Sequence, residues 1–410
     1  MINPATVRLL TALRHKLHQQ AELSGAEIQT QKLIRKFLEQ HCPSASITPI
    51  AETGLLVAFP NLNESSIQHP APHKNPVQAL DAAPHGSAKS GPALLFRADI
   101  DALPIQDRIA SAYQSLNNGV GHKCGHDGHT VILCGLAMHL QAHPPEAARV
   151  FLLFQPAEET GEGAKRVWAT LSQDQQHFDY VFALHNIPGV ALGHILCKAG
   201  PITSAVISMI VKLEGRRAHA AEPWHAINPS SAIGPMLAAA RSLEEHNGKR
   251  DDFAVITPIH LWVGSPDYGI SPADAELHFT LRCRTSQVLA QKVQAFCSQI
   301  DQIANQEKLR VHYHQLQAFE SCVNEESAVA LVCEAARSLA LPYTEMEHSF
   351  SWGEDFGLYT QHYKAALFGI GAGESLPQLH EDTYDFPDAL IAPAVEMFQA
   401  LLKHTAASHV

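Results

Sequence analysis

The sequence predicts an α/β protein in which a largely parallel sheet, flanked by helices, carries an inserted α+β domain. Four short, continuously apolar runs are typical of strands buried on both faces of a sheet, and helical stretches separate most of them. Between residues 200 and 315 the pattern changes to the order β-α-β-β-α-β, which is typical of a ferredoxin-like module. We therefore expect residues 1–199 and 316–410 to form the main domain and residues 200–315 to form the insert.

The composition excludes several classes of partner. Asp and Glu exceed Lys and Arg by 41 − 29 = 12, and no long basic run occurs, which argues against nucleic acid and anionic membranes and favours a small substrate. The eight cysteines show no paired framework. Residues 1–20 are typical of an amphipathic helix rather than a signal peptide. No apolar run approaches the roughly 20 residues of a membrane span, so we expect a cytoplasmic protein.

The first 92 residues predict two helices, a strand and a loop. Two helical patterns occupy residues 4–42, where Ser24 is expected to cap the second helix and Glu27 to complete a capping box. TGLLVAF, residues 53–59, is typical of a strand. Residues 61–92 show no periodicity, so we expect a long exposed loop and assign it no function.

A polar cluster follows each of the four apolar runs. Because ligands bind beyond the carboxyl ends of the strands in such sheets, we expect these clusters to converge on one crevice. The runs are ALLF (93–96), VFLLF (150–154), YVFAL (180–184) and AALFGI (365–370), and the clusters are RADIDALP, QPAEETGEG, HNIPG and GAGESLPQLHEDTYDFPD.

Metal-binding residue types are densest in GHKCGHDGHT, residues 121–130. Cys124 and His126 precede an apolar helix, whose partial positive charge is expected to lower the pKa of the thiol, and thiolate and imidazole both suit zinc. The stretch alone leaves a structural zinc clip, a redox cysteine and a catalytic metal site open. A structural clip needs a second Cys or His pair at the usual spacing, and the sequence has none. We expect His122 and His129 to lie at the helix end or to support the ligands.

Two carboxylates, Glu158 and Glu159, directly follow an apolar run, which is costly unless a positive charge lies close by. Adjacent side chains point in different directions, so one carboxylate could bind metal while the other removes a proton from water. The alternative is a solvated acidic loop.

Arg97, Asp99 and Asp101 share one face at the end of their strand. They could form a structural ion pair, or the carboxylates could orient metal-binding histidines. His185 and His380 each follow or end a strand. Alone, either histidine could be structural.

In these motifs the chain resembles the zinc-dependent aminoacylase and carboxypeptidase family of metallohydrolases. It is most similar to the amidohydrolase branch of N-acyl-amino-acid, hippurate and auxin-conjugate hydrolases. The similarity spans nearly the whole chain and rests on the motifs LHQQAELSGAE, RADIDALPIQD, HKCGHDGHT, FQPAEETGEGA, ALHNIPG, RRAHAAEPWHAINP, WGEDFG and LHEDTYDFPD, in this order.

The resemblance implies a site with two divalent metal ions per subunit, with zinc favoured and manganese, cobalt or nickel as alternatives. Cys124 is the implied bridging ligand, and Glu158 is the implied general base and acid. The other implied ligands are His126, Glu159, His185 and His380.

The resemblance also implies that the insert is a lid and dimerisation domain, which makes the protein a homodimer. His219 is the implied histidine that holds the substrate or the oxyanion. Three departures leave substrate specificity open. Arg217 and Ala218 replace the usual Gly-Gly before this histidine, and Trp224 follows Pro223 where the branch has histidine. Tyr268 lies where an asparagine usually contacts substrate.

We therefore predict a metal-dependent amidohydrolase that cleaves the amide bond of N-acyl amino acids or related conjugates. A dipeptidase or peptidase on the same site is the neighbouring alternative. A non-catalytic metal- or ligand-binding protein is the alternative from another class, although such a protein has no use for a base at Glu158.

Overall fold

The computed structural model describes residues 2–59, 91–171, 176–247, 250 and 252–407. Nearly all of the loop expected at residues 61–92 lies outside the described residues. The chain divides into two compact units. Unit 1 comprises Met1–Gly200, Val323–Glu347 and Leu358–Val410, and unit 2 comprises Pro201–Cys322 and His348–Gly357.

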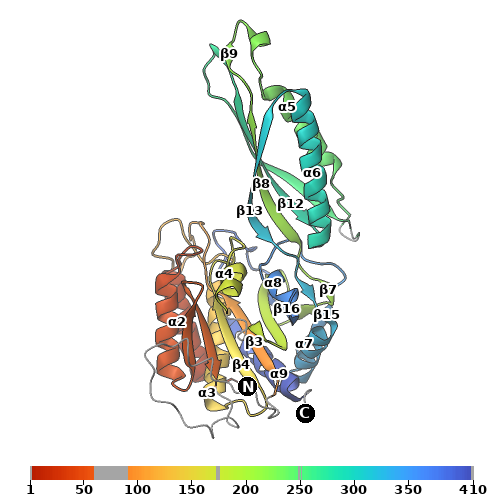
Figure 1. Ribbon diagram of the computed structural model, residues 1–410. Helices are drawn as coiled ribbons and strands as arrows, with labels where there is room; N and C mark the ends of the chain where they lie inside the picture. Colours follow the sequence, from red (N-terminus) through yellow and green to blue (C-terminus); the bar gives the residue numbers. More distant parts are fainter. Residues whose placement is uncertain (1, 60–90, 172–175, 248–249, 251, 408–410) are drawn as a thin grey trace. The chain divides into compact units, whose positions relative to one another are not determined.

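An eight-stranded sheet organises unit 1, in the order β1-β2-β4-β3-β5-β16-β6-β15 (Figure 1). The pairs β3–β4, β3–β5, β5–β16 and β6–β15 are parallel, and the remaining pairs are antiparallel. The strands are β1 (Ser46–Ile50), β2 (Gly54–Phe59), β3 (Ala93–Asp99), β4 (Arg149–Gln155), β5 (Tyr180–Pro188), β6 (Ile195–Cys197), β15 (Tyr343–Glu345) and β16 (Lys364–Gly373). The four predicted apolar runs are the four adjacent strands β4, β3, β5 and β16, so the predicted α/β fold class is confirmed.

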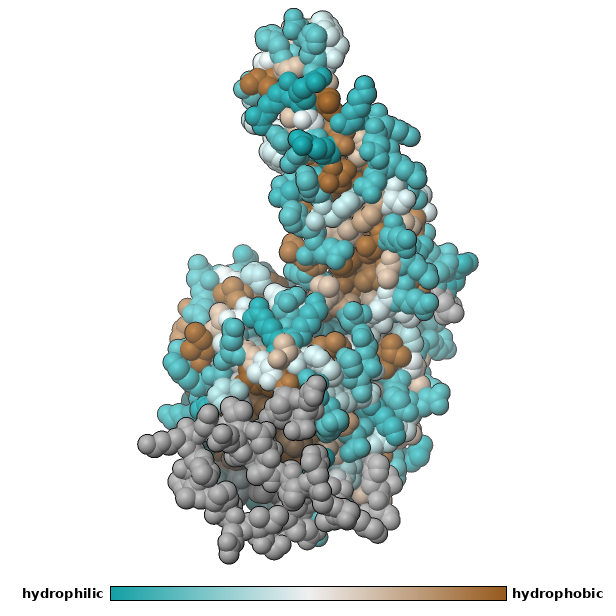
Figure 2. Space-filling view, in the orientation of Figure 1, coloured by the Kyte–Doolittle hydropathy of each residue, from teal (hydrophilic) through white to brown (hydrophobic). Residues whose placement is uncertain are grey.

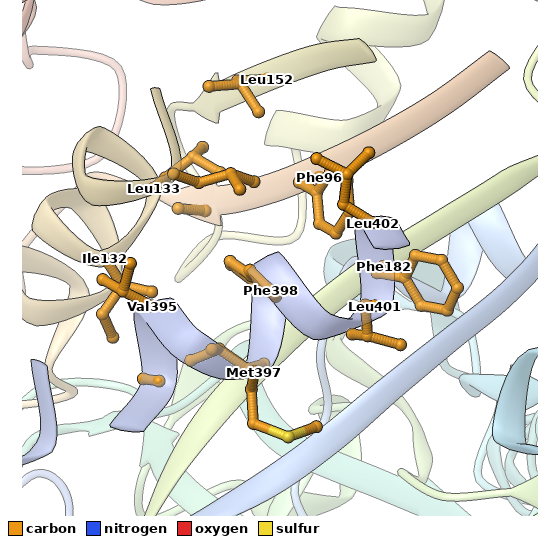
Figure 3. Close-up of a cluster of buried hydrophobic side chains, with 14 of the residues drawn as sticks. Phe96, Ile132, Leu133, Leu152, Phe182, Val395, Met397, Phe398, Leu401 and Leu402 are labelled. Carbon is orange, nitrogen blue, oxygen red and sulfur yellow. The ribbon is translucent and has the colours of Figure 1, made fainter. Parts of the chain in front are cut away.

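Helices pack on this sheet and bury its apolar side chains in one core (Figure 3). Phe398 of α9 lies 5.2 Å from Phe96 of β3 and 6.2 Å from Phe368 of β16 between ring centroids. Leu133 of α3 is fully buried in the same core, and each such side chain contributes about 1.5–3 kcal/mol to stability. Helix α3 is therefore fixed firmly against the sheet. The helices are α1 (Pro4–Gln19), α2 (Ile28–His41), α3 (His126–Ala142), α4 (Gly163–Thr170), α7 (Glu326–Ser338), α8 (Gly357–Thr360) and α9 (Ile391–Ala407).

The capping box predicted for α2 is wrong. Glu27 is the residue before the helix, and its side chain makes no capping hydrogen bond. The cap comes from Glu22, whose Oε2 accepts the backbone N–H groups of Gln29 (2.8 Å) and Thr30 (2.9 Å). The side chain of Ser24 donates instead to a buried aspartate of another segment.

Unit 2 contains a four-stranded antiparallel sheet in the order β10-β12-β8-β13, against which α5 and α6 pack. The alternating burial along β8 and β12 agrees with one covered face. The elements are β8 (Ala205–Glu214), α5 (Ser230–Ser242), β10 (Ala254–Val263), β12 (Asp274–Cys283), α6 (Ser286–Gln306) and β13 (Arg310–Phe319). This is the predicted β-α-β-β-α-β order.

Apolar patches interrupt the hydrophilic surface of unit 2 on the face drawn in Figure 2. The exposed large apolar side chains of this unit are Trp224, Ile259, Leu261, Trp262, Tyr268, Ile270 and Leu316. No helix among the described residues is long and apolar enough to cross a membrane.

Candidate metal centre

Polar side chains gather at the carboxyl ends of the four adjacent strands of unit 1. His185 lies in β5, and Glu159 follows β4. His380 follows β16. His126 is the first residue of α3, the helix that follows β3, and Cys124 lies two residues before it. The convergence expected from the parallel topology is therefore present.

Two groups of three potential ligands share one thiol. Cys124, His126 and His185 form the first group, and Cys124, Glu159 and His380 form the second, each with ligand atoms within 4.8 Å of one another. Cys124 Sγ lies 3.5 Å from His185 Nε2. The Glu159 carboxylate lies 3.8 Å from the Nε2 atoms of both His126 and His380. This arrangement could hold two cations with Cys124 between them.

Backbone carbonyls orient two of these histidines. His126 Nδ1 lies 3.0 Å from the carbonyl oxygen of Asp101, and His185 Nδ1 lies 2.9 Å from that of Asn186. A carbonyl oxygen only accepts hydrogen bonds, so each Nδ1 carries the proton and donates it. In the neutral form of each ring, the Nε2 atom then has the lone pair that a metal requires.

The buried polar atoms of this cluster fit a cation. His126 Nε2 and Glu159 Oε1 are buried and have no hydrogen-bond partner among the described residues, which is costly unless another group compensates. Burial raises the pKa of Glu159 to about 8, and a positive charge would offset this penalty. Burial also lowers the pKa of His185 to about 3, which keeps the ring in the neutral form that binds metals.

The expected lowering of the Cys124 pKa by the helix start is wrong. Burial, with Glu159 close by, raises the pKa of this thiol well above its usual value. The partial charge at a helix N-terminus is small compared with the penalty of burying a thiolate. A bound cation rather than α3 is therefore what would favour the thiolate.

His129 and His122, which were expected to play supporting roles, differ in their hydrogen bonding. His129 Nδ1 lies 2.6 Å from Asp99 Oδ1, and its Nε2 faces the side chain of Asn186, so neither nitrogen is left for a metal. Both ring nitrogens of His122 are buried, and no residue in the described part of the chain forms a hydrogen bond with them. Burial lowers the pKa of His122 to about 4, so this ring is neutral.

Arg97, Asp99 and Asp101, at the end of β3 and just after it, form an ion pair and also contact histidines of the cluster. Arg97 Nη1 donates to Asp99 Oδ2 at 2.7 Å, which is a buried ion pair. Asp99 also holds His129, and Asp101 Oδ1 lies 3.3 Å from His126 Nδ1. The carboxylates thus orient the histidine side of the cluster.

The two residues expected to be catalytic lie in different units. Glu158 is almost fully buried, and its carboxylate lies within 4.8 Å of ligand atoms of His126 and Glu159. His219 is an exposed residue of the short strand β9 (Ala218–His219) in unit 2. Its Nδ1 accepts the N–H of Ala221 at 3.1 Å, so its Nε2 carries the proton and can donate.

A buried charge network behind α3 was not predicted. His18 of α1 lies between two carboxylates, with Nε2 3.1 Å from Asp107 Oδ2 and Nδ1 2.9 Å from Asp127 Oδ2. Arg14 donates to the same oxygen of Asp127 at 3.1 Å. Lys123 donates to Asp107. The network ties α1 to the loop and helix that carry Cys124 and His126, through residues that are far apart in the sequence.

We expect this network to make folding stability depend on pH. Burial alone would lower the pKa of His18, but the hydrogen bonds to Asp107 and Asp127 raise it from 6.5 to about 9. Protonated His18 therefore stabilises the fold fully below pH ~6.5, and the contribution of about 3 kcal/mol is lost as the pH rises through about 9. Urea unfolding between pH 6 and 10 measures how the free energy of unfolding falls as the pH rises. His18→Gln should remove most of this fall, whereas the exposed control His143→Gln should leave it unchanged.

The comparison with known proteins identifies the family. Residues 95–404 match the model of peptidase family M20/M25/M40. The chain belongs to this family. It is 31% identical over 373 residues to an N-acetyl-L-cysteine deacetylase of Bacillus subtilis, across 90% of this chain and 82% of that protein. It is 27% identical to a hippurate hydrolase of Campylobacter jejuni, across 95% and 94% of the two chains.

A solved structure shows the same fold. It is a Bacillus subtilis protein described as a dinuclear metal-binding peptidase of the M20 family, with a TM-score of 0.78, 24% sequence identity and coverage of 99% of each chain. Membership of the M20/M25/M40 family confirms the predicted resemblance and the predicted enzyme class, a metal-dependent hydrolase of amide bonds.

Proposed function

We propose that this M20 protein removes the acyl group from N-acyl amino acids or related conjugates at a centre for two divalent metal ions. The observation that carries the proposal is the pair of three-residue groups that share Cys124. We assign Cys124, His126 and His185 to one ion and Cys124, Glu159 and His380 to the other. The names of the deacetylase and hydrolase relatives support the substrate class, and the dinuclear structural neighbour supports the number of ions.

We assign Glu158 as the general base and acid. Bound divalent ions supply Lewis acidity, which polarises a carbonyl and lowers the pKa of water. A carboxylate oxygen of Glu158 accepts a proton from the attacking water and then donates it to the nitrogen of the leaving amino acid. The burial of Glu158 beside the ligand atoms of His126 and Glu159 supports this assignment. A protein that only binds metal or ligand would have no use for such a base.

The proposal also assigns a role to the inserted domain and to His219 within it. We assign residues 200–315 to a lid and dimerisation domain, and residues 1–199 and 316–410 to the catalytic domain. His219 would donate from Nε2 to the substrate or to the oxyanion, since its Nδ1 is already occupied by a backbone N–H. Sedimentation analysis tests the homodimer, and a monomer with full activity would contradict it.

We propose zinc as the bound metal, because thiolate and imidazole suit it, although cobalt, nickel and manganese remain testable alternatives. Treatment with a chelator should remove the ions and abolish turnover of an N-acetyl amino acid. Adding back single metals should restore activity, and elemental analysis should give about two ions per chain, the number that the site predicts. Full activity in metal-free protein would contradict the proposal.

The neighbouring candidate is a dipeptidase or peptidase, which the description of the family favours. Rates for N-acetyl amino acids, N-benzoylglycine and dipeptides separate the two functions. An amidohydrolase should hydrolyse the acylated substrates without needing a free amino group. A strict requirement for that group would favour the peptidase.

We also propose a cytoplasmic location. All eight cysteines are free thiols, as in proteins of reducing compartments. Fractionation of the producing cells tests this assignment.

A further inference from the structure

The backbone on both sides of Glu158 is held by buried carboxylates. The N–H of Ala157 donates to Glu27 Oε1 at 2.8 Å, and the N–H of Glu159 donates to Asp101 Oδ2 at 3.0 Å. All four partners belong to unit 1. The base that we propose thus lies between two anchored peptide groups.

The anchored turn has a conformation that its sequence does not favour. Ala157 has a φ of 55°, in the left-handed region that only glycine adopts readily. Its carbonyl accepts the N–H of Gly163 at 3.0 Å, and a Cβ on Gly163 would lie 1.9 Å from the carbonyl oxygen of Pro156. The turn is therefore closely packed, and contacts from outside must hold Ala157 in place.

Glu27 provides such a contact from the start of α2. Its carboxylate is fully buried and accepts three hydrogen bonds, from the N–H of Gly25 (2.8 Å), the hydroxyl of Thr53 (2.6 Å) and the N–H of Ala157 (2.8 Å). A buried carboxylate is costly, and burial raises the pKa of Glu27. Capping does not explain its presence, because Glu22 already caps α2.

We propose that Glu27 is a positioning residue for Glu158, since its carboxylate fixes the left-handed Ala157 and thereby the direction in which the next side chain points. This inference rests on the proposed function, in which Glu158 is the base. Glu27 acts through one backbone hydrogen bond, and its three hydrogen-bond partners include none of the proposed metal ligands.

The test compares Glu27→Ala, Glu27→Gln and Thr53→Val in the full-length, metal-loaded protein. Glu27→Ala removes the acceptor for Ala157 and should lower kcat by up to about 100-fold, the effect of misplacing a reacting group by about 1 Å. KM and metal content should stay unchanged. Glu27→Gln keeps an acceptor oxygen and should recover most of kcat. Thr53→Val removes only the second contact of Glu27, so it should lower stability but not kcat.

A second measurement does not depend on activity. Hydrogen exchange of the peptide around Ala157 should be about 10-fold faster in Glu27→Ala than in Glu27→Gln, because Gln keeps a hydrogen-bond acceptor for that amide whereas Ala does not. If Glu27→Ala folds less well, Glu27→Gln is compared with the natural protein. Exchange at Ala157 and kcat should then be nearly the same in both, and a large loss of kcat with unchanged exchange would overturn the positioning role.

The outcomes separate this inference from the proposed function. If Glu158→Ala abolishes turnover but Glu27→Ala keeps full kcat, Glu27 does not position the base. The same conclusion follows if Glu27→Ala, Glu27→Gln and Thr53→Val all lower kcat equally. If Glu158→Ala itself keeps full activity, the assignment of the base is wrong, and the positioning role is overturned with it.

Discussion

Glu158→Ala should lower kcat by about 10²- to 10⁴-fold, the usual contribution of a general base, while the protein should keep its metal ions. The reason is that the two adjacent carboxylates have different roles, with Glu158 as the base and Glu159 as a metal ligand. Glu159 faces His126 and His380 through its two oxygens, so it can stay with the ions when Glu158 is lost. Turnover of an N-acetyl amino acid and elemental analysis of the same samples measure both effects.

Glu162→Ala is the matched control for this substitution. Glu162 follows Glu158 in the same loop, but its side chain is 45% exposed and pairs only weakly with Lys165 at 3.5 Å. This control should change neither kcat nor metal content. Unchanged kcat in Glu158→Ala would exclude Glu158 as the base, and loss of metal in that variant would instead indicate a ligand.

The central sheet could be predicted because its strands carry their own signal. The apolar runs that became β3, β4, β5 and β16 are continuous, since both of their faces are buried. The strands β1, β6 and β15 were missed. Each is short, and β1 has only one buried residue and β15 none, so no apolar run marks them.

The candidate ligands could be predicted for a related reason. Side chains at the carboxyl ends of adjacent parallel strands must lie close together, which brings His185, Glu159 and His380 to the start of α3. Their grouping around Cys124 could not be derived from spacing. It depended on the resemblance and, in the structure, on the loop that follows β16.

The supporting residues could not be predicted, because their partners are distant in the sequence. Glu27 and Ala157 are 130 positions apart, and Arg14 and Asp127 are 113 positions apart. Local pattern was even misleading for Glu27, whose spacing from Ser24 fits a capping box that does not form. The pKa of Cys124 was mispredicted for the same reason, since burial depends on the whole fold.

Cys124→Ala should have a larger effect on metal binding than any other single substitution in the centre. Cys124 belongs to both groups of three, whereas His185 and His380 each belong to one of these two groups. We therefore expect Cys124→Ala to lose both ions and all measurable turnover. His185→Ala and His380→Ala should each weaken the binding of one ion more than that of the other. Elemental analysis after extensive dialysis distinguishes these patterns.

Cys134→Ala is the control for the loss of a buried thiol. Cys134 lies in α3 within the apolar core, and burial raises its pKa well above the usual value, as it does for Cys124. Its removal should lower stability by the amount expected for a small cavity, about 1 kcal/mol, and leave two ions bound. If Cys124→Ala kept both ions and Cys134→Ala lost them, the metals would be held elsewhere. If Cys124→Ala lost only one ion, the thiol would be a terminal ligand rather than a bridge.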